Sequence, residues 1–128
     1  MNSFMTNPAA LFDLTRKVAI VTVATGAFGA VAARVFAAAG VRLVLAAGKT
    51  SELEALAVDC EKAGAEVETL NVRPSSEASC NAIVDAAVKR FGCVDILVVA
   101  SGKNDVSKIV DMTPERFLDV MDANVTQS

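Results

Sequence analysis

The chain has 128 residues, a length that predicts no more than one domain. Hydrophobic residues make up 53% of the sequence and charged residues 21%, a balance that excludes a disordered chain. The 12 lysines and arginines stand against 15 acidic residues, which gives a net charge of -3. Because the basic residues are also scattered, we expect no nucleic-acid partner.

Residues that bind metals or form disulfides are sparse. The sequence has no histidine, and its 3 cysteines are odd in number, far apart and without a CxxC pair. They are Cys60, Cys80 and Cys93. We therefore predict reduced thiols and no metal site. The first residues lack the features of a secretory signal, and Arg34 interrupts the most apolar segment, so we expect no membrane association and a cytoplasmic location.

The first part of the chain predicts one strand and one helix. Residues 1–16 are a mixed N-terminal lead-in to a domain over residues 17–128. Residues 17–23 are a continuous β-branched run, which is typical of a strand buried on both faces. A helix is predicted over residues 27–39, ended by Gly40. The apolar face of this helix is predicted to consist of Val31, Val35 and Ala38.

A second strand and helix follow. The strand is predicted over residues 41–47, and the helix begins with a capping box of Ser51 and Glu54 and ends at Gly64. Its predicted apolar face consists of Leu53, Leu56, Ala57 and Cys60. Residues 65–72 alternate between apolar and polar, which predicts a third strand near the edge of the sheet.

The last part predicts two more helices and one strand. One helix begins at Ser75 or Ser76 and ends at Gly92. Its predicted apolar stripe consists of Cys80, Val84, Val88 and Phe91. Residues 94–101 predict a fourth buried strand, and the Thr-Pro pair at residues 113–114 begins a final helix.

The alternation of strands and helices predicts an α/β fold. Helical connections of this length join parallel strands, and right-handed crossovers place helices on both faces of an open sheet. We expect the strand order 3-2-1-4, with a ligand crevice at the carboxyl ends of strands 1 and 4.

Three separated segments carry a resemblance to a known family. They are KVAIVTVATGAFGAVAARVFAAAGVRLVLAAGK, DAAVKRFGCVDILVVASG and MTPERFLDVMDANV. They resemble the cofactor turn of short-chain dehydrogenases/reductases, with its pattern T-G-x-x-x-G-x-G, the passage that ends in N-N-A-G, and the helix with the family's asparagine. The resemblance runs from about Leu14 to the end of the chain. It implies a Rossmann-like doubly wound sheet, an NAD or NADP cofactor, a small-molecule alcohol or carbonyl substrate, and a homodimer or homotetramer at full length.

The resemblance places the first half of a cofactor site in the turn after the first strand. The residues concerned are Thr22, Val23, Thr25, Gly26, Ala27, Phe28 and Gly29. Val23 and Ala27 replace the first two motif glycines, and Gly29 keeps the third. A left-handed backbone at Val23 costs about 1–3 kcal/mol, so we expect the turn to change shape, with Gly26 relieving it. The methyl of Ala27 stands where the backbone approaches the pyrophosphate. From the residues alone, an ordinary packed βα turn remains the alternative.

The resemblance places the rest of the cofactor site after the other strands. The residues are Ala47, Gly48, Lys49, Asn71, Val72, Ala100, Ser101 and Gly102. The family's acidic residue for the adenosine ribose is missing near Ala47, which argues against ordinary NAD selection. Lys49 is then either a partner for the 2′-phosphate of NADP or a solvated lysine. Asn71 and Val72 stand where the family has Asp-Val beside the adenine, and residues 99–102 keep only the glycine of N-N-A-G.

The resemblance implies that the chemistry lies elsewhere. Asn124 matches the family's asparagine, which has a supporting role in a proton relay. The family's catalytic serine, tyrosine and lysine are absent, since the sequence contains no tyrosine and stops at Ser128. We expect the N-terminal half of a longer oxidoreductase, with a sheet truncated before its later strands and a bare apolar edge at the fourth strand.

Two other hypotheses remain open. The lost glycines, acidic residue and amides also fit a degenerate, non-catalytic interaction or structural module. A third possibility is a protein that binds another phosphate-bearing ligand at the same turn.

Overall fold

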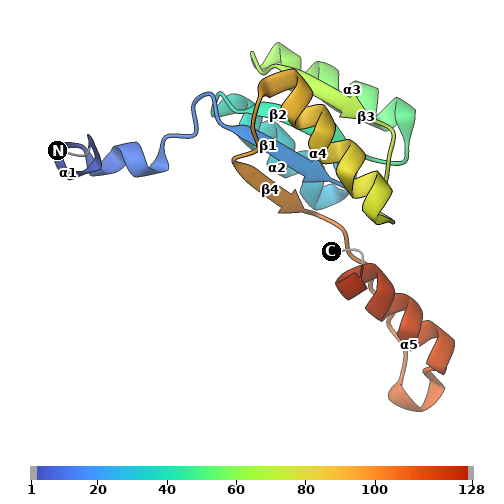
Figure 1. Cartoon of the computed structure of the whole chain (residues 1–128). Coiled ribbons are helices and arrows are strands. Elements are labelled where there is room, and N and C mark those ends of the chain that lie inside the picture. Colours follow the sequence, from blue (N-terminus) through green and yellow to red (C-terminus); the bar gives the residue numbers. More distant parts are fainter. Residues whose placement is uncertain (1–2, 127–128) are drawn as a thin grey trace.

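The computed structural model describes residues 3–126. The chain begins with two short helical segments, α1 (Ser3–Thr6) and η1 (Pro8–Phe12), which extend away from the body of the molecule (Figure 1). Of the apolar residues in this lead-in, Leu14 packs against the core, whereas Leu11 and Phe12 are exposed.

Four parallel strands form the sheet. They are β1 (Val18–Thr22), β2 (Arg42–Ala46), β3 (Val67–Leu70) and β4 (Ile96–Val99). Their order is β3-β2-β1-β4, which confirms the prediction. Thr22 lies opposite Ala46 on one side and Val99 on the other, so the carboxyl ends of three strands meet at one edge.

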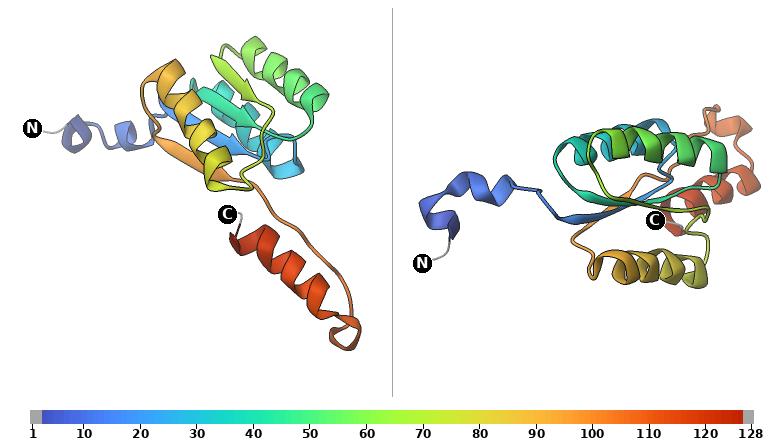
Figure 2. Two further views of the ribbon diagram at one scale, coloured as in Figure 1. Left: turned by 45° about the vertical axis from the view of Figure 1, so that its right-hand side comes forward. Right: turned by 90° about the horizontal axis from the view of Figure 1, so that it is seen from above.

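Helices cover both faces of the sheet. Figure 2 shows α2 (Ala27–Ala38) and α3 (Thr50–Lys62) on one face and α4 (Glu77–Phe91) on the other. Alternate residues of each strand face opposite sides, so Leu43 and Leu45 pack under α2 and α3, while Ile20 and Val44 pack under α4. Two apolar clusters, one on each face, therefore hold the sheet between helices.

The sheet has an apolar edge at β4. Leu97 is 61% exposed and Val99 is 41% exposed, whereas their neighbours Ile96 and Val98 pack against the core. The expected apolar edge is confirmed, but the prediction of a fully buried strand over residues 94–101 is wrong. Beyond β4, η2 (Ile109–Asp111), α5 (Pro114–Met121) and η3 (Asp122–Thr126) extend away from the sheet (Figure 1). None of the helices in residues 3–126 has both the length and the hydropathy to cross a membrane.

The buried face of α2 differs from the prediction. Gly29, Ala33 and Ala37 are buried, while Val31 and Val35 are 59% and 61% exposed. Small residues at every fourth position allow the helix to approach the sheet closely, and the larger valines then lie on the outer side. The predicted face of Val31, Val35 and Ala38 is wrong: the charged Arg34 lies on that same side of the helix, where it pairs with Asp59, so this side faces outward.

The start of α3 and the buried face of α4 also differ from the prediction. The helix α3 begins at Thr50 and its cap, Lys49, makes no side-chain capping bond, so Ser51 and Glu54 lie within the helix and form no capping box. On α4, Ile83 and Ala87 are the buried residues. The predicted stripe is therefore wrong for its exposed members, which are Cys80, Val84 and Val88. The predicted starts of α4 and α5 are confirmed: Ser76 forms a capping box with Ser79, and Thr113 caps α5.

Asp95 ties the start of β1 to the segment before β4. Its Oδ2 accepts a hydrogen bond from the Val18 N–H at 2.8 Å, and its Oδ1 lies 3.5 Å from Lys17 Nζ. The hydrogen bond from Val18, together with Lys17, holds the pKa of Asp95 below its ordinary value. A carboxylate with a lowered folded-state pKa adds stability above its unfolded pKa of about 3.9 and loses that contribution as the pH falls through the folded pKa.

We therefore expect Asp95→Asn to lower the urea midpoint at neutral pH. The difference from the parent protein should shrink as the pH falls below about 4, because the unfolded parent chain then binds a proton at Asp95 more readily than the folded protein does, and the contribution is gone once the folded carboxylate is also protonated. Equilibrium unfolding at several pH values measures it. Asp85→Asn, which removes a carboxylate with no ion pair among residues 3–126, is the matched control. A midpoint difference that stays constant down to the acid range would contradict the role of Asp95.

Candidate functional site

The turn between β1 and α2 keeps a left-handed residue although that residue is not glycine. Val23 has a φ of 49°, and the Gly26 N–H donates to the Val23 carbonyl at 2.9 Å. A β-branched residue in this region is strained. The expected change of shape at Val23 is therefore not found: the turn has the backbone conformation for which glycine is suited, and valine adopts it.

Gly29 is the residue that permits close approach of α2. A Cβ atom at this position would lie 2.6 Å from the Val23 carbonyl oxygen and 3.0 Å from the Ala24 Cα. Both are backbone atoms, so no side chain can move aside. At Gly26 the corresponding distance to the Val23 carbonyl oxygen is 3.2 Å, a tight but less severe contact.

The first turn of α2 presents free backbone donors. Gly26 caps the helix without any side-chain hydrogen bond. Within residues 3–126, the N–H groups of Ala27, Phe28 and Gly29 have no acceptor. Free amides and the positive end of the helix dipole favour an anion at this point. No acidic side chain lies in the first turn to occupy the position instead.

The end of β2 leads into a corner held by Asn71. In the orientation that satisfies both ends of its amide, Asn71 donates to the carbonyls of Ala47 and Gly48 at 3.0 and 3.3 Å and accepts from Thr50 Oγ1. Lys49 pairs with Glu52 on the first turn of α3, at 2.9 Å. The side chains of Asn71 and Lys49 are thus both engaged within the protein.

A small cavity opens between the β1 turn and the loop that follows β4. Its volume is about 280 Å³, and its lining residues are Val23, Arg73, Pro74, Ser101, Gly102, Lys103 and Ala123. The Ser101 Oγ is buried and has no hydrogen-bond partner in the described part of the chain. An unpaired buried hydroxyl costs free energy, so Ser101 has a hydrogen bond still to make at the wall of this cavity. The cavity joins three of the segments at which the sequence predicted cofactor contacts.

Asn124, which lies in η3, connects α5 to this same loop. Its Oδ1 accepts from the Lys103 N–H at 3.1 Å, and its Nδ2 donates to the Lys103 and Val120 carbonyls at 2.8 Å each. Its Oδ1 would also lie 3.3 Å from a Cβ on Gly102. Asn124 therefore positions the loop that carries Ser101 and Gly102.

Charged side chains near this loop are paired with one another. Lys103 pairs with Asp119, and Arg116 pairs with Asp105 through two hydrogen bonds. The hydrogen bonds from Arg116 hold the pKa of Asp105 below its ordinary value. These pairs join the loop to α5, and neither carboxylate is placed as a general acid at the cavity.

The other residues that the sequence predicted to contact a cofactor differ in how far their side chains are buried. Thr22 is buried and its Oγ1 donates to the Val98 carbonyl at 3.4 Å. Val72 packs into the cluster beneath α4, which makes it a core residue. Phe28 is 69% exposed, while Thr25 and Ala100 are half-buried.

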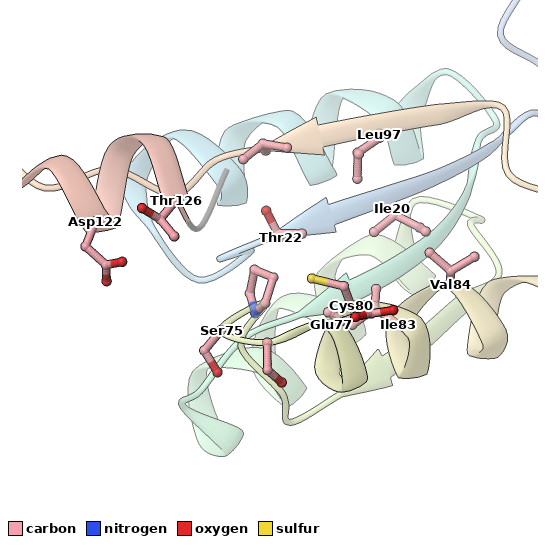
Figure 3. A pocket seen from close by; sticks show the side chains of 13 residues that line it. Ile20, Thr22, Ser75, Glu77, Cys80, Ile83, Val84, Leu97, Asp122 and Thr126 are labelled. Carbon is pink, nitrogen blue, oxygen red and sulfur yellow. The ribbon is translucent and has the colours of Figure 1, made fainter.

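A larger apolar slot lies on the α4 side of β1, on the opposite face of the sheet from α2. Its volume is about 470 Å³, and Figure 3 shows it between α4 and the strands, with Ile20, Leu97 and Val84 along its wall. The exposed β4 side chains of Leu97 and Val99 form part of its lining. We assign no ligand to it, because part of its volume comes from the exposed side of β4 and, within residues 3–126, no buried side-chain polar atom of its lining lacks a hydrogen-bond partner.

Sequence reasoning missed Arg73 and Lys103, which both line the small cavity. Neither belongs to a motif, and the distance between residues 73 and 103 in the chain gives no signal that they meet. The thiols are free, as expected, with Cys60 buried and Cys80 and Cys93 exposed. No group of three possible metal ligands occurs in residues 3–126.

Known proteins are similar to this chain in fold and in sequence. The family described as short chain dehydrogenase matches residues 17–128. An uncharacterized oxidoreductase of Mycobacterium tuberculosis is 44% identical over 116 residues, which cover 91% of this chain and 42% of that protein. A short-chain type dehydrogenase/reductase from Mycobacterium marinum superposes with a TM-score of 0.84 and 28% identity, covering 92% of this chain and 48% of the other.

A polyketide enzyme is also similar. A variant of actinorhodin polyketide ketoreductase, solved with NADPH, has a TM-score of 0.80 and 30% identity, covering 88% of this chain and 43% of its own. This chain therefore spans less than half the length of these relatives.

Proposed function

The chain belongs to the short-chain dehydrogenase/reductase family, and from this premise we propose that it holds the nicotinamide cofactor of an NAD(P)-dependent oxidoreductase. The intact protein would transfer hydride between that cofactor and a small-molecule alcohol or carbonyl compound. We assign the cofactor-binding part of that protein to this chain, because the chain contains the turn between β1 and α2.

The first turn of α2 is the observation that carries the proposal. Three consecutive amides without acceptors lie at the helix N-terminus, next to a turn whose backbone keeps its left-handed residue. The cofactor's pyrophosphate is an anion that such a group of donors binds. Gly29 lets the first turn of α2 lie directly against the Val23 and Ala24 backbone, which keeps these amides beside the turn.

The remaining residues orient the cofactor. The bound nicotinamide supplies the hydride acceptor or donor. Ser101 would satisfy its buried hydroxyl on a polar group of the cofactor, and Asn124 fixes the loop that presents Ser101 and Gly102. Asn124 thus has a positioning role in this chain, consistent with the supporting role that the resemblance implies.

A carbonyl substrate is supported by the ketoreductase among the similar structures. We propose that the intact protein reduces a small carbonyl compound, with a homodimer or homotetramer as its assembly. Exposed apolar residues on α5, among them Phe117 and Leu118, are compatible with further packing of this helix.

A second candidate function is a non-catalytic module of the same fold. The observation that favours it is a valine at a left-handed position that suits glycine. Backbone strain in the turn that would contact the pyrophosphate would weaken cofactor binding. In that case the chain would act as an interaction or structural domain.

Turnover by the intact protein distinguishes the two candidates. We expect loss of the reduced nicotinamide absorbance when the protein is mixed with NADPH or NADH and a panel of aldehydes, ketones and 3-ketoacyl thioesters. The same mixture without carbonyl compound is the control. Saturable cofactor binding without turnover of any carbonyl compound, or of alcohols in the reverse direction, would favour the non-catalytic module.

A further inference from the structure

The loop that follows β4 and the helix α5 lie side by side and run in opposite directions (Figure 2). Asn124 and Asp119 both contact Lys103, at the beginning of the loop. Arg116, in the first turn of α5, contacts Asp105 farther along the loop. Because these contacts follow one another in antiparallel order, a shift of α5 along its axis would move the loop with it.

The contact between Arg116 and Asp105 is a two-bond ion pair. The Arg116 Nε donates to the Asp105 Oδ2 at 2.8 Å, and its Nη2 donates to the Oδ1. A planar guanidinium with two bonds to one carboxylate fixes both the distance and the orientation of the partners. The Asp105 side chain is only 16% exposed, so water screens this pair less than a fully exposed one. The pair is therefore a firm link between the loop and the first turn of α5.

The backbone on the helix side of this link is also held in place. The Arg116 N–H donates to the Oγ1 of Thr113, the residue that caps α5, at 3.3 Å. The guanidinium therefore extends from a capped helical turn, and the position of Asp105 follows from the position of that turn.

The other ion pair of the loop is a weaker link. The side chains of Lys103 and Asp119 are 47% and 59% exposed. An ammonium group lacks the planar fork of a guanidinium, and exposed pairs of this kind contribute little to stability. The position of α5 along the loop thus depends more on Asp105 and Arg116 than on Lys103 and Asp119.

The geometry of the small cavity depends on where α5 lies. Asn124 accepts from the Lys103 N–H and donates to the Lys103 carbonyl, and Ser101, Gly102 and Lys103 are part of the cavity lining. A displacement of about 1 Å in a group that orients a ligand can reduce a rate by about 100-fold. A link outside the cavity can therefore control how its wall meets a ligand.

We propose that Asp105 and Arg116 are positioning residues for cofactor binding. Their ion pair holds α5 against the loop after β4, and this keeps Asn124 bound to the Lys103 backbone at the cavity wall. The inference rests on the proposed function, since it requires a nicotinamide cofactor at this cavity. It requires no contact between the cofactor and either member of the pair.

Side-chain amide NMR of the intact protein without cofactor tests the structural step. In Asp105→Asn we expect the Nδ2 signals of Asn124 to move toward those of Asn81, which is exposed on α4. Their hydrogen exchange should become about tenfold faster, the value of one net hydrogen bond. Asp111→Asn is the matched control, because it removes an exposed carboxylate of the same loop that has no ion pair among residues 3–126. Unchanged Asn124 signals in Asp105→Asn would overturn the inference.

Fluorescence titration with NADPH tests the step that concerns function. We expect Asp105→Asn and Arg116→Gln each to weaken binding by about 3- to 30-fold, within the range of coupling energies in one network. The double variant should lose no more than either single variant, because both act through one ion pair. Asp111→Asn should stay within about twofold of the parent protein.

The thermal unfolding midpoint separates positioning from general destabilisation. A merely structural role would lower the midpoint and the affinity together, and the losses would multiply in the double variant. We expect the affinity to fall without a large change in the midpoint, since the pair lies outside both apolar clusters of the sheet.

The possible failures are distinguishable. Saturable NADPH binding that both single variants leave unchanged overturns the inference and leaves the proposed function intact. Losses that multiply in the double variant also overturn it, as does a loss in Asp119→Asn as large as that in Asp105→Asn. If the parent protein binds neither NADPH nor NADH, the proposed function fails, and the inference fails with it.

Discussion

Gly29→Ala is expected to lower the free energy of unfolding by about 1–3 kcal/mol, the range for adding a group to a packed site. The new methyl would lie 2.6 Å from the Val23 carbonyl oxygen and 3.1 Å from the Ala24 carbonyl oxygen. Since both contacts are with backbone, α2 must move away from β1. Alanine's higher helix propensity, worth about 1 kcal/mol, offsets only part of this cost. The displaced amides should also lose most of their affinity for NADPH.

Gly26→Ala is the matched control for this substitution. Its methyl would meet the Val23 carbonyl oxygen at 3.2 Å, with no other backbone contact as close. We expect a loss of about 0.5–1 kcal/mol, typical of an unfavourable cap residue. Chemical denaturation of both variants provides the comparison. Equal stability of Gly29→Ala and the parent protein would show that α2 does not need this close approach.

Val23→Gly should have the opposite effect. The left-handed conformation of Val23 stores about 1–3 kcal/mol of strain, and glycine adopts it freely. The greater freedom of glycine in the unfolded chain offsets about 0.5–1 kcal/mol, so we expect a net gain of about 1 kcal/mol. Val23 also lines the small cavity, and its removal should raise the affinity for NADPH several-fold.

Val23→Ala separates the two contributions. Alanine lacks the two methyl groups of valine but keeps a Cβ, so it enlarges the cavity without the full freedom of glycine at positive φ. We expect Val23→Ala to reproduce part of the gain in affinity and little of the gain in stability. If alanine stabilised the protein as much as glycine, backbone strain at Val23 would not explain the result.

The sheet was predictable because its signals are local. Residues 18–22 are β-branched or small and buried throughout, and glycines at positive φ end the helices at Gly40, Gly64 and Gly92. Parallel connection then follows from the length of the crossovers. The resemblance to a family and the pattern of strands therefore lead to the same strand order, which the structure confirms.

Helix faces were harder to predict from the same sequence. In α2 every side offers apolar residues, and the buried ones are Gly29, Ala33 and Ala37, the smallest available. Close approach to the sheet decides this choice, and such packing is a tertiary effect that hydrophobic periodicity does not record. The start of α3 depends in the same way on a distant residue, since Asn71 binds Thr50 and the carbonyls before it.

The candidate site, too, could be predicted from the sequence only in part. The position of the β1 turn follows from the sequence, as does the importance of Val23 and Gly29. The position of Arg73 on the cavity wall does not, because it depends on how the loop after β3 directs a long side chain over Gly48. A free cation at a motif position, Lys49, was the natural expectation, but its pairing with Glu52 becomes visible only in three dimensions.

The most direct test of the account is an NMR titration of the intact protein with NADPH, observed at the backbone amides of α2. The account predicts saturable chemical-shift changes at Ala27, Phe28 and Gly29, with the same Kd as cofactor fluorescence gives. Changes confined to the apolar slot beside α4, or no saturable change at these three amides, would contradict the assignment of the β1 turn as the pyrophosphate site.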